Sequence, residues 1–540
     1  MYEIKPIVTN LGDGELLRLI AKVDGLSTAD QCAYHESALA EDLQLRDYIE
    51  SQVRFINRIG KDPNRDEVVG QLVKEPSSVV AEPMGLTVLA AFALTFGGVG
   101  QTGSYLLKPL MGLNFETLRR PGTDEIRFAS DSMSSAIASF SLNAERYLNV
   151  RWRFHELISL SRTAEARAHA QYVNLDAEIE AIFGTSYDSL IAASWVIDCL
   201  LDPEEIRRRG EAAIRYRELN GLDNEGKVRR FLDQFTIQVD DLREIVRTSP
   251  LDRLRETLYM QLLRTPVIAL DADRFLIPST RFFENTVSLG WFYALLEARR
   301  SISPRESQRL LNFFGALFEQ YIVSIVLRIA RNTGAKAWGE ETIGSVKTSD
   351  AMLKRGGDLI LIEVASSRLS AGILGDPADA ALLEKDLERT LFEKTDQVAD
   401  NVNHVLRGEL TDRDLSPNDV TRIYPLVAQY RSFLRTEGLQ EQLQRRFVER
   451  LANDDARIRP IEIVDAELLE GLEEHLRDSV HLAQLIEEKV TPGSQYISAT
   501  FKNFVCHRHP EFPLRMSESA SAAERDWAMK LKRIVESWCG

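Results

Sequence analysis

Residues 349–365 read SDAMLKRGGDLILIEVA and contain the strongest structural signal of the C-terminal half. Two short apolar runs flank the pair Gly356-Gly357, and two glycines can adopt the positive φ angles of a two-residue hairpin turn. We therefore expect one strand over Asp350–Lys354 and an antiparallel partner over Leu359–Ala365. The run Leu359–Ile362 is continuously apolar rather than alternating, which indicates a central strand with both faces covered.

Helical and strand-like segments alternate on both sides of this hairpin. An apolar helix over Leu311–Arg331 and a strand over Ala335–Trp338 precede it. The segments expected after it are a helix over Pro377–Leu406, a strand over Arg422–Ala428, a helix over 438–452, a strand over Ile461–Val464 and a helix over Ala466–Glu488. This order is typical of one mixed sheet covered by helices, so we predict an α/β domain over residues 301–490.

The residues before this domain have a different pattern. Apolar residues recur at three-to-four spacing from about residue 10 to 265, which predicts a mainly helical region over residues 1–300. One helix start is clear at Asp202-Pro203-Glu204-Glu205, where Asp202 can cap the free amides and Glu205 can close a capping box. That helix is expected to run toward Asn220. Residues 491–540 are expected to form a helical, basic tail, so the fold class is a multidomain α+β and α/β chain.

Composition excludes several classes of protein. The 66 Lys and Arg residues are outnumbered by 82 Asp and Glu, and the net charge of −16 argues against an unspecific, histone-like grip on nucleic acid. The longest nearly apolar stretch, residues 85–100, is shorter than the ~20 residues of a membrane-spanning helix. The N-terminal residues lack the pattern of an export signal, and four scattered cysteines suit a reducing compartment. We expect a soluble, cytoplasmic protein with no membrane partner, for which oligomerisation stays open.

Two carboxylates are expected to meet at the open end of the hairpin. Asp350 starts one strand and Glu363 lies late in the other, so a fold at Gly356-Gly357 places them side by side. Two close carboxylates repel unless a cation lies between them, and Mg²⁺ binds through one or two carboxylates. Glu319 lies at the edge of the apolar face of the preceding helix and is a third candidate. The alternative is that Asp350 caps a strand while Glu363 and Glu319 are solvated.

These residues resemble the PD-(D/E)xK, or restriction-endonuclease-like, nucleases over residues 300–490. The resemblance rests on motifs spread through the predicted domain: Phe318-Glu319-x-Tyr321, Ser349-Asp350, Gly356-Gly357, Ile362-Glu363-Val364-Ala365, Lys394-x-x-Gln397, Ile423-Tyr424-Pro425-Leu426-Val427 and Pro460-Ile461-Glu462-Ile463-Val464. It implies a metal-dependent phosphodiesterase with Mg²⁺ or Mn²⁺ as cofactor. Asp350 and Glu363 would be metal ligands, and Glu319 an accessory acid.

The chain departs from that family where its motif places a lysine. Two residues after the second acid stands Ala365, which cannot orient water or offset charge in a transition state. Lys394, Arg368 and Lys354 are candidate replacements. We favour Lys394, because a helix packed on the sheet can project a side chain over the strand ends, and Gln397 would share its face.

A basic segment in the helical region is a candidate nucleic-acid contact. Its arginines are Arg207, Arg208, Arg209, Arg215, Arg217, Arg229 and Arg230. Such a cluster can neutralise several phosphates. The alternative is a solvated helix face on which these arginines pair with Glu204, Glu205, Glu211 and Glu218.

Two other motifs carry less weight. Gly98-x-Gly100-x-x-Gly103 matches a dinucleotide-binding fingerprint, but the residues before it are helical in character rather than strand-like. A second motif has candidate zinc ligands without the usual spacing of structural zinc sites. It consists of Cys506, His507 and His509, with Cys32 and His35 as a distant pair.

The sequence therefore predicts a metal-dependent nuclease, with DNA as the expected substrate. A large helical region joined to such a domain suggests an effector of bacterial phage defence or restriction, with partner proteins of that system, by analogy of fold alone. The alternative is a catalytically degenerate nuclease fold that acts as a nucleic-acid-binding or scaffold subunit, which would explain Ala365 directly.

Overall fold

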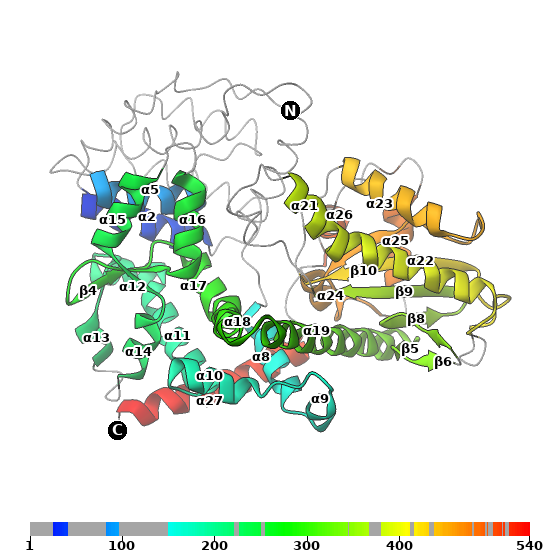
Figure 1. The fold of residues 1–540 in the computed structure, drawn as a ribbon, viewed down its shortest axis with the longest axis horizontal. Helices are drawn as coiled ribbons and strands as arrows, with labels where there is room; N and C mark the ends of the chain where they lie inside the picture. The colour runs from blue at the N-terminus through cyan, green and yellow to red at the C-terminus, as the bar shows by residue number, and fades with distance from the viewer. Residues whose placement is uncertain are drawn as a thin grey trace, which may run out of the picture.

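The fold is that of a computed structural model (Figure 1). It describes residues 25–40, 83–96, 150–220, 226–249, 254–343, 345–366, 380–410, 415–430, 437–477, 480–491, 494, 500–509, 511–512 and 518–539. Within these residues the protein is a mixed α/β structure, with helices dominating the N-terminal part and the larger sheet in the C-terminal part. The expected mixed α/β class, with a mainly helical N-terminal part, is confirmed.

The C-terminal sheet has five strands in the order β11-β10-β9-β8-β5. The strands are β5 (Lys336–Gly339), β8 (Ala351–Arg355), β9 (Asp358–Ala365), β10 (Arg422–Gln429) and β11 (Glu462–Asp465). The pairs β5–β8 and β8–β9 are antiparallel, whereas β9–β10 and β10–β11 are parallel. A helical crossover between β9 and β10 makes that parallel pairing possible.

Helices cover both faces of this sheet, as the continuous apolar run predicts. Ile360 and Ile362 belong to the apolar cluster of α19 (Pro304–Thr333). Leu359 and Leu361 point to the other face, into the cluster of α22 (Glu393–Leu406) and α23 (Glu437–Arg450). In Figure 1, α22 and α23 lie above the sheet and α19 below it.

The hairpin forms as predicted. Arg355 pairs with Asp358, so the connection is the two residues Gly356 and Gly357, and Gly356 has φ of 57°. At Gly357 a Cβ would lie 2.3 Å from Oγ1 of Thr421, so this position needs a residue without a side chain. The register of Ala351 against Ile362 fixes which residues meet at the open end of the hairpin.

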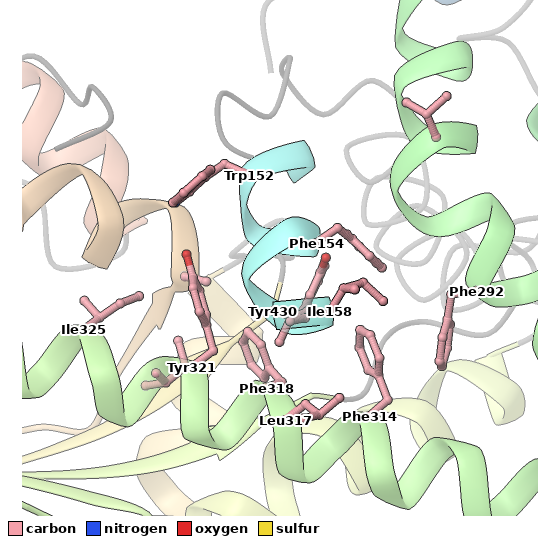
Figure 2. Packing of buried hydrophobic residues seen from close by; sticks show 14 of the residues in the cluster. Trp152, Phe154, Ile158, Phe292, Phe314, Leu317, Phe318, Tyr321, Ile325 and Tyr430 are labelled. Atoms are coloured by element: carbon pink, nitrogen blue, oxygen red, sulfur yellow. The ribbon is translucent and has the colours of Figure 1, made fainter. Parts of the chain in front are cut away.

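The long helix α19 connects the two parts of the molecule. Ser303 caps its first turn, and Gly334 ends it with φ of 63°. Figure 2 shows its side chains Phe314, Leu317 and Phe318 packing against α8 (Val150–Ser161). Among the described helices α19 alone has the length and apolar composition to cross a membrane, yet half of its most apolar stretch is buried inside the protein. The buried side chains of α19 pack in the apolar cluster that it shares with the sheet and the N-terminal helices.

The N-terminal part contains thirteen described α-helices and one π-helix. Besides α8 they are α2 (Gly25–Ala40), α5 (Pro83–Phe96), α9 (Ala164–Ala168), α10 (Leu175–Phe183), α11 (Tyr187–Leu201), α12 (Pro203–Arg209), α13 (Tyr216–Asn220), α14 (Lys227–Asp233), α15 (Val239–Thr248), α16 (Leu254–Arg264), α17 (Thr280–Asn285), α18 (Trp291–Ile302) and the π-helix η2 (Thr286–Gly290). The sequence did not predict the four-stranded sheet of order β1-β4-β3-β2 among them. Its strands, β1 (Ile214–Arg215), β2 (Thr236–Gln238), β3 (Val267–Ala269) and β4 (Arg274–Leu276), are too short to show a two-residue period.

Several predicted helices have different bounds. Asp202 caps α12 as predicted, through Oδ1 to the amides of Glu204 and Glu205. The helix ends at Arg209 rather than near Asn220, because Gly210 adopts a left-handed conformation with φ of 78°. The carboxylate of Glu205 contacts Arg208 instead of closing a capping box.

One of the two long helices predicted in the C-terminal half is interrupted. The helix predicted over 377–406 is continuous from Ala380 to Leu406, as α21 (Ala380–Leu387), the π-helix η3 (Glu388–Phe392) and α22. The one predicted over 466–488 divides into α24 (Ala466–Leu472) and α25 (Leu482–Val490). A small hairpin of β6 (Thr342–Ile343) and β7 (Val346–Lys347) follows β5. Apolar spacing alone does not reveal these changes of helix type or the gap, since buried leucines lie on both sides, Leu387 and Leu391 at η3 and Leu472 and Leu482 at the gap.

The C-terminal tail returns to the N-terminal part. Its helices are α26 (Phe501–Arg508) and α27 (Glu518–Cys539). In Figure 1, α27 runs beneath α8 and α10, and its Lys530 forms a 2.6 Å ion pair with Asp188 of α11. The ring of Trp527 stacks on His155 of α8 with centroids 4.2 Å apart. The expected helix is therefore packed on the fold.

Candidate metal and catalytic site

Asp350 and Glu363 meet at the open end of the β8–β9 hairpin. Asp350 directly precedes β8, and continuing the register of Ala351 with Ile362 places it opposite Glu363. Its Oδ2 accepts a hydrogen bond of 2.7 Å from the backbone N–H of Val364. Both acids are buried, with 2% and 3% of their surface exposed. The hairpin thus holds two carboxylates beside each other inside the protein.

Lys394 on α22 reaches both carboxylates. Its Nζ lies 3.1 Å from Oδ2 of Asp350 and 3.4 Å from Oε2 of Glu363. Burial acts to lower the pKa of Lys394, but the two carboxylates outweigh it and raise that pKa above its ordinary value. The crossover helix therefore places an ammonium group beside the acids, although Ala365 stands at the motif position. Lys354 pairs with Leu359 near the turn end of the hairpin, and Arg368 lies outside the described residues.

Asn401, rather than Gln397, is the amide side chain that contacts the acids. Gln397 is exposed on α22. Asn401 lies two helical turns after Lys394, is 6% exposed, and donates from Nδ2 to Oε1 of Glu363 at 2.9 Å. Sequence reasoning missed it, although a spacing of seven residues on a helix is the signal that places two side chains on one face.

Asp350 also belongs to a second group of acids, which does not include Glu363. Ligand atoms of Glu319, Glu340 and Asp350 all lie within 4.8 Å of one another. Glu319 is positioned by α19, and Glu340 directly follows β5. Glu340 was not predicted, because in the sequence it is one of several acids in a loop. Its carboxylate also forms a 2.7 Å ion pair with Lys347 of β7.

The electrostatics of the site show a surplus of negative charge. Burial and then the neighbouring Asp350 raise the pKa of Glu363 from 4.5 to about 8. The same two causes raise the pKa of Glu319 from 4.5 to about 7. Both carboxylates therefore resist ionisation near neutral pH, and a divalent cation would relieve that resistance.

The arginines of the predicted basic segment are mostly engaged with other side chains. Arg208 pairs with Glu205 at 2.6 Å and Arg215 with Glu211 at 2.9 Å. Arg207 donates to the hydroxyl of Tyr34, and Arg229 stacks over the ring of Tyr216 at 4.3 Å. Arg230 is exposed on α14. The segment therefore has the local pairing that the alternative interpretation describes.

The two weaker motifs bring no ligand set together in the described part of the chain. Residues 98–103 lie outside it. The two ring nitrogens of His509 contact Glu488 and Glu511, and Cys506 and His507 are exposed. Cys32 and His35 are buried in α2. Among the described residues, the group formed by Glu319, Glu340 and Asp350 is the only set of three such side chains close enough to share an ion.

The comparisons with known proteins found no relative. No protein-family model matches the chain, and no curated protein or solved structure matches it significantly.

Proposed function

We propose that this protein is a Mg²⁺-dependent nuclease, with DNA as substrate, and that Asp350 is the central residue of its active site. The observation that carries the proposal is the convergence of acids from α19, the loop after β5 and the β8–β9 hairpin, with one lysine from α22. The order of helix, three antiparallel strands, helix and parallel strand supports the resemblance to restriction-endonuclease-like proteins. An effector of phage defence or restriction is the setting in which we place it.

The residues fit a hard divalent cation. Mg²⁺ prefers oxygen ligands, and the site presents carboxylate oxygens together with a buried amide oxygen, Oδ1 of Asn401, which has no hydrogen-bond partner. When bound, such an ion supplies activation of water and neutralisation of phosphoryl charge. Asp350, Glu319 and Glu363 are the predicted ligands, and Mn²⁺ suits the same donors.

Lys394 would take the part of the missing motif lysine. In phosphodiester hydrolysis a water oxygen bonds to phosphorus, while one P–O ester bond breaks and its electron pair goes to the departing oxygen. The attacking water loses a proton and the departing oxygen gains one. Negative charge grows on the phosphoryl oxygens in the transition state. An ammonium group held at the carboxylates lowers the energy of that transition state. The two ion pairs of Lys394 keep this group at the site.

Cleavage assays test the proposal. Three proteins are incubated with plasmid DNA or RNA and with Mg²⁺ or Mn²⁺: wild type, Glu363→Ala and the control Glu393→Gln. The control removes an exposed acid beside Lys394. We expect wild type and control to cleave and Glu363→Ala to lose at least about 100-fold, since such site interactions contribute several kcal/mol. Equal rates for Glu363→Ala and wild type, or no cleavage of any substrate, would contradict the proposal.

A second candidate is a nucleic-acid-binding or scaffold subunit that has lost its chemistry. It is favoured by Ala365 and by the ammonium group of Lys394, which already neutralises part of the acid pair. This candidate predicts that Mn²⁺ changes the melting temperature little, because a ligand stabilises only the state that binds it. It also predicts that Ala365→Lys gains cleavage that wild type lacks.

A further inference from the structure

The acids around Asp350 fall into two groups with different partners. On one side, both oxygens of Glu363 are engaged: Oε1 by Asn401 at 2.9 Å and Oε2 by Lys394 at 3.4 Å. On the other side, Glu319 and Glu340 approach Asp350. The hydrogen bonds that Asp350 accepts from Val364 and Lys394 both end on Oδ2.

We infer that the divalent cation is held by Glu319, Glu340 and Asp350, and that Glu363 is a positioning residue fixed by Lys394 and Asn401 rather than a metal ligand. The inference rests on the proposed function and changes its predicted ligand set. Glu340 replaces Glu363 as the third carboxylate.

Charge placement supports this division. Lys394 already provides a cation between Asp350 and Glu363. A second cation at the same place would be repelled by the ammonium group, since two like charges a few ångströms apart interact strongly in a buried site. On the other side of Asp350, Lys347 contacts Glu340 at 2.7 Å, but its side chain is 67% exposed and free to turn into solvent. A divalent ion can displace that exposed contact more easily than the buried ones.

The amide of Asn401 indicates a further ligand on the Glu363 side. Its Nδ2 is directed at Glu363, and its Oδ1 is buried without a hydrogen-bond partner among the described residues. Buried polar atoms in proteins are almost always satisfied, by protein groups or by ordered water. A water molecule at Oδ1 would satisfy that atom on the Glu363 side of the cluster. The cation would then be held by the other group of acids, Glu319, Glu340 and Asp350.

Binding of Mn²⁺ to the full-length protein tests this assignment without relying on activity. Isothermal titration measures the affinity of wild type, Glu340→Gln, Glu363→Gln and the control Glu393→Gln. We expect Glu340→Gln to weaken binding at least about tenfold, since it removes a charged ligand of the ion. Glu363→Gln and the control should stay within about threefold of wild type, and Glu363→Gln should lose cleavage while it keeps the metal. Melting curves in EDTA confirm that each variant is folded.

The opposite pattern would overturn the inference. If Glu363→Gln loses Mn²⁺ while Glu340→Gln keeps it, the ion lies between Asp350 and Glu363, yet cleavage by wild type would still support the proposed function. If wild type binds no Mn²⁺, both the ligand assignment and the metal-dependent function are wrong.

Discussion

Two ionic sites on the same sheet, one fully buried and one partly exposed, are built differently. At β11, Glu462 forms a 2.8 Å ion pair with Lys489 of α25, and the two side chains are 1% and 0% exposed. At the open end of the β8–β9 hairpin, Lys394 pairs with Asp350 and Glu363, Lys347 pairs with Glu340, and Glu319 approaches Asp350 and Glu340. The first site joins one buried acid to one buried lysine, whereas the second groups four acids with two lysines.

The difference separates a structural ion pair from a candidate functional site. Burying a charge costs several kcal/mol unless a partner compensates it, so a balanced pair is stable without a ligand. An unbalanced cluster raises the pKa values of its acids, as for Glu319 and Glu363. Surplus buried charge therefore indicates a site that a ligand completes.

The largest effect that sharpens this comparison is expected at the balanced pair. Lys489→Met leaves Glu462 buried without its ammonium partner and should lower the free energy of unfolding by about 3–5 kcal/mol. Urea denaturation measures it. Mn²⁺ affinity should not change, because this pair is not part of the metal site.

A compensating variant is the control for that prediction. Adding Glu462→Leu to Lys489→Met removes the uncompensated charge and should recover most of the lost stability. A double variant as unstable as Lys489→Met alone would show that packing of the lysine stem, rather than charge, is what matters there.

An intermediate effect is expected from pH at the unbalanced cluster. The pKa of Glu363 is about 8 in the folded protein against an ordinary 4.5, and that of Glu319 is about 7. At pH values between 4.5 and the raised pKa of each group, the folded state binds more protons than the unfolded state. These two groups therefore make the free energy of unfolding fall as pH rises from about 4.5 to 8.

Divalent metal should oppose this loss, because it binds the ionised carboxylate of Glu319 and its charge favours ionisation of the nearby Glu363. Urea titrations at pH 5.5 and 8.5, each with EDTA or with Mg²⁺, measure the stabilisation that the metal provides. We expect it to be larger at pH 8.5. Equal stabilisation at both pH values would show that the ion binds away from Glu319 and Glu363. The pKa of Glu467 is also raised to about 7, but its effect on the free energy of unfolding is the same with and without metal.

The smallest effect is expected in the arginine-rich segment. Arg215 forms a partly exposed pair with Glu211, so Arg215→Ala should change the free energy of unfolding by less than about 1 kcal/mol. The slope of log Kd against log salt for a DNA duplex should also stay unchanged. A slope reduced by about 0.9 would mean that Arg215 neutralises a phosphate, and the basic segment would then be a nucleic-acid interface.

Much of the C-terminal fold could be predicted from local sequence. The Gly356-Gly357 turn and the apolar run of β9 were sufficient for the hairpin, because turn chemistry and burial on both faces act over a few residues. The short strands β1–β4 and the interruption of the helix over 466–488 were not predicted. Their bounds depend on packing between segments far apart in the chain, and the spacing of residues along the chain does not predict that packing.

The candidate site divides in the same way. Asp350, Glu363 and Lys394 were predicted, and the structure brings them together. Glu319 was predicted as well, and it lies on the other side of Asp350. Glu340 and Asn401 were missed, since an acid in a loop and an amide on a helix are ordinary until their neighbours are known, while Gln397 is exposed.

The sequence by itself determined that two acids share the end of one hairpin, because the turn and the two-residue period of strands fix that register. Only the tertiary structure decided how the acids are compensated. Long-range packing places Lys394 and Asn401 of α22 against Glu363, and Glu319 of α19 with Glu340 against Asp350. The Coulomb energy of these charges depends on their distances in space, and the separation of the residues along the chain does not determine those distances.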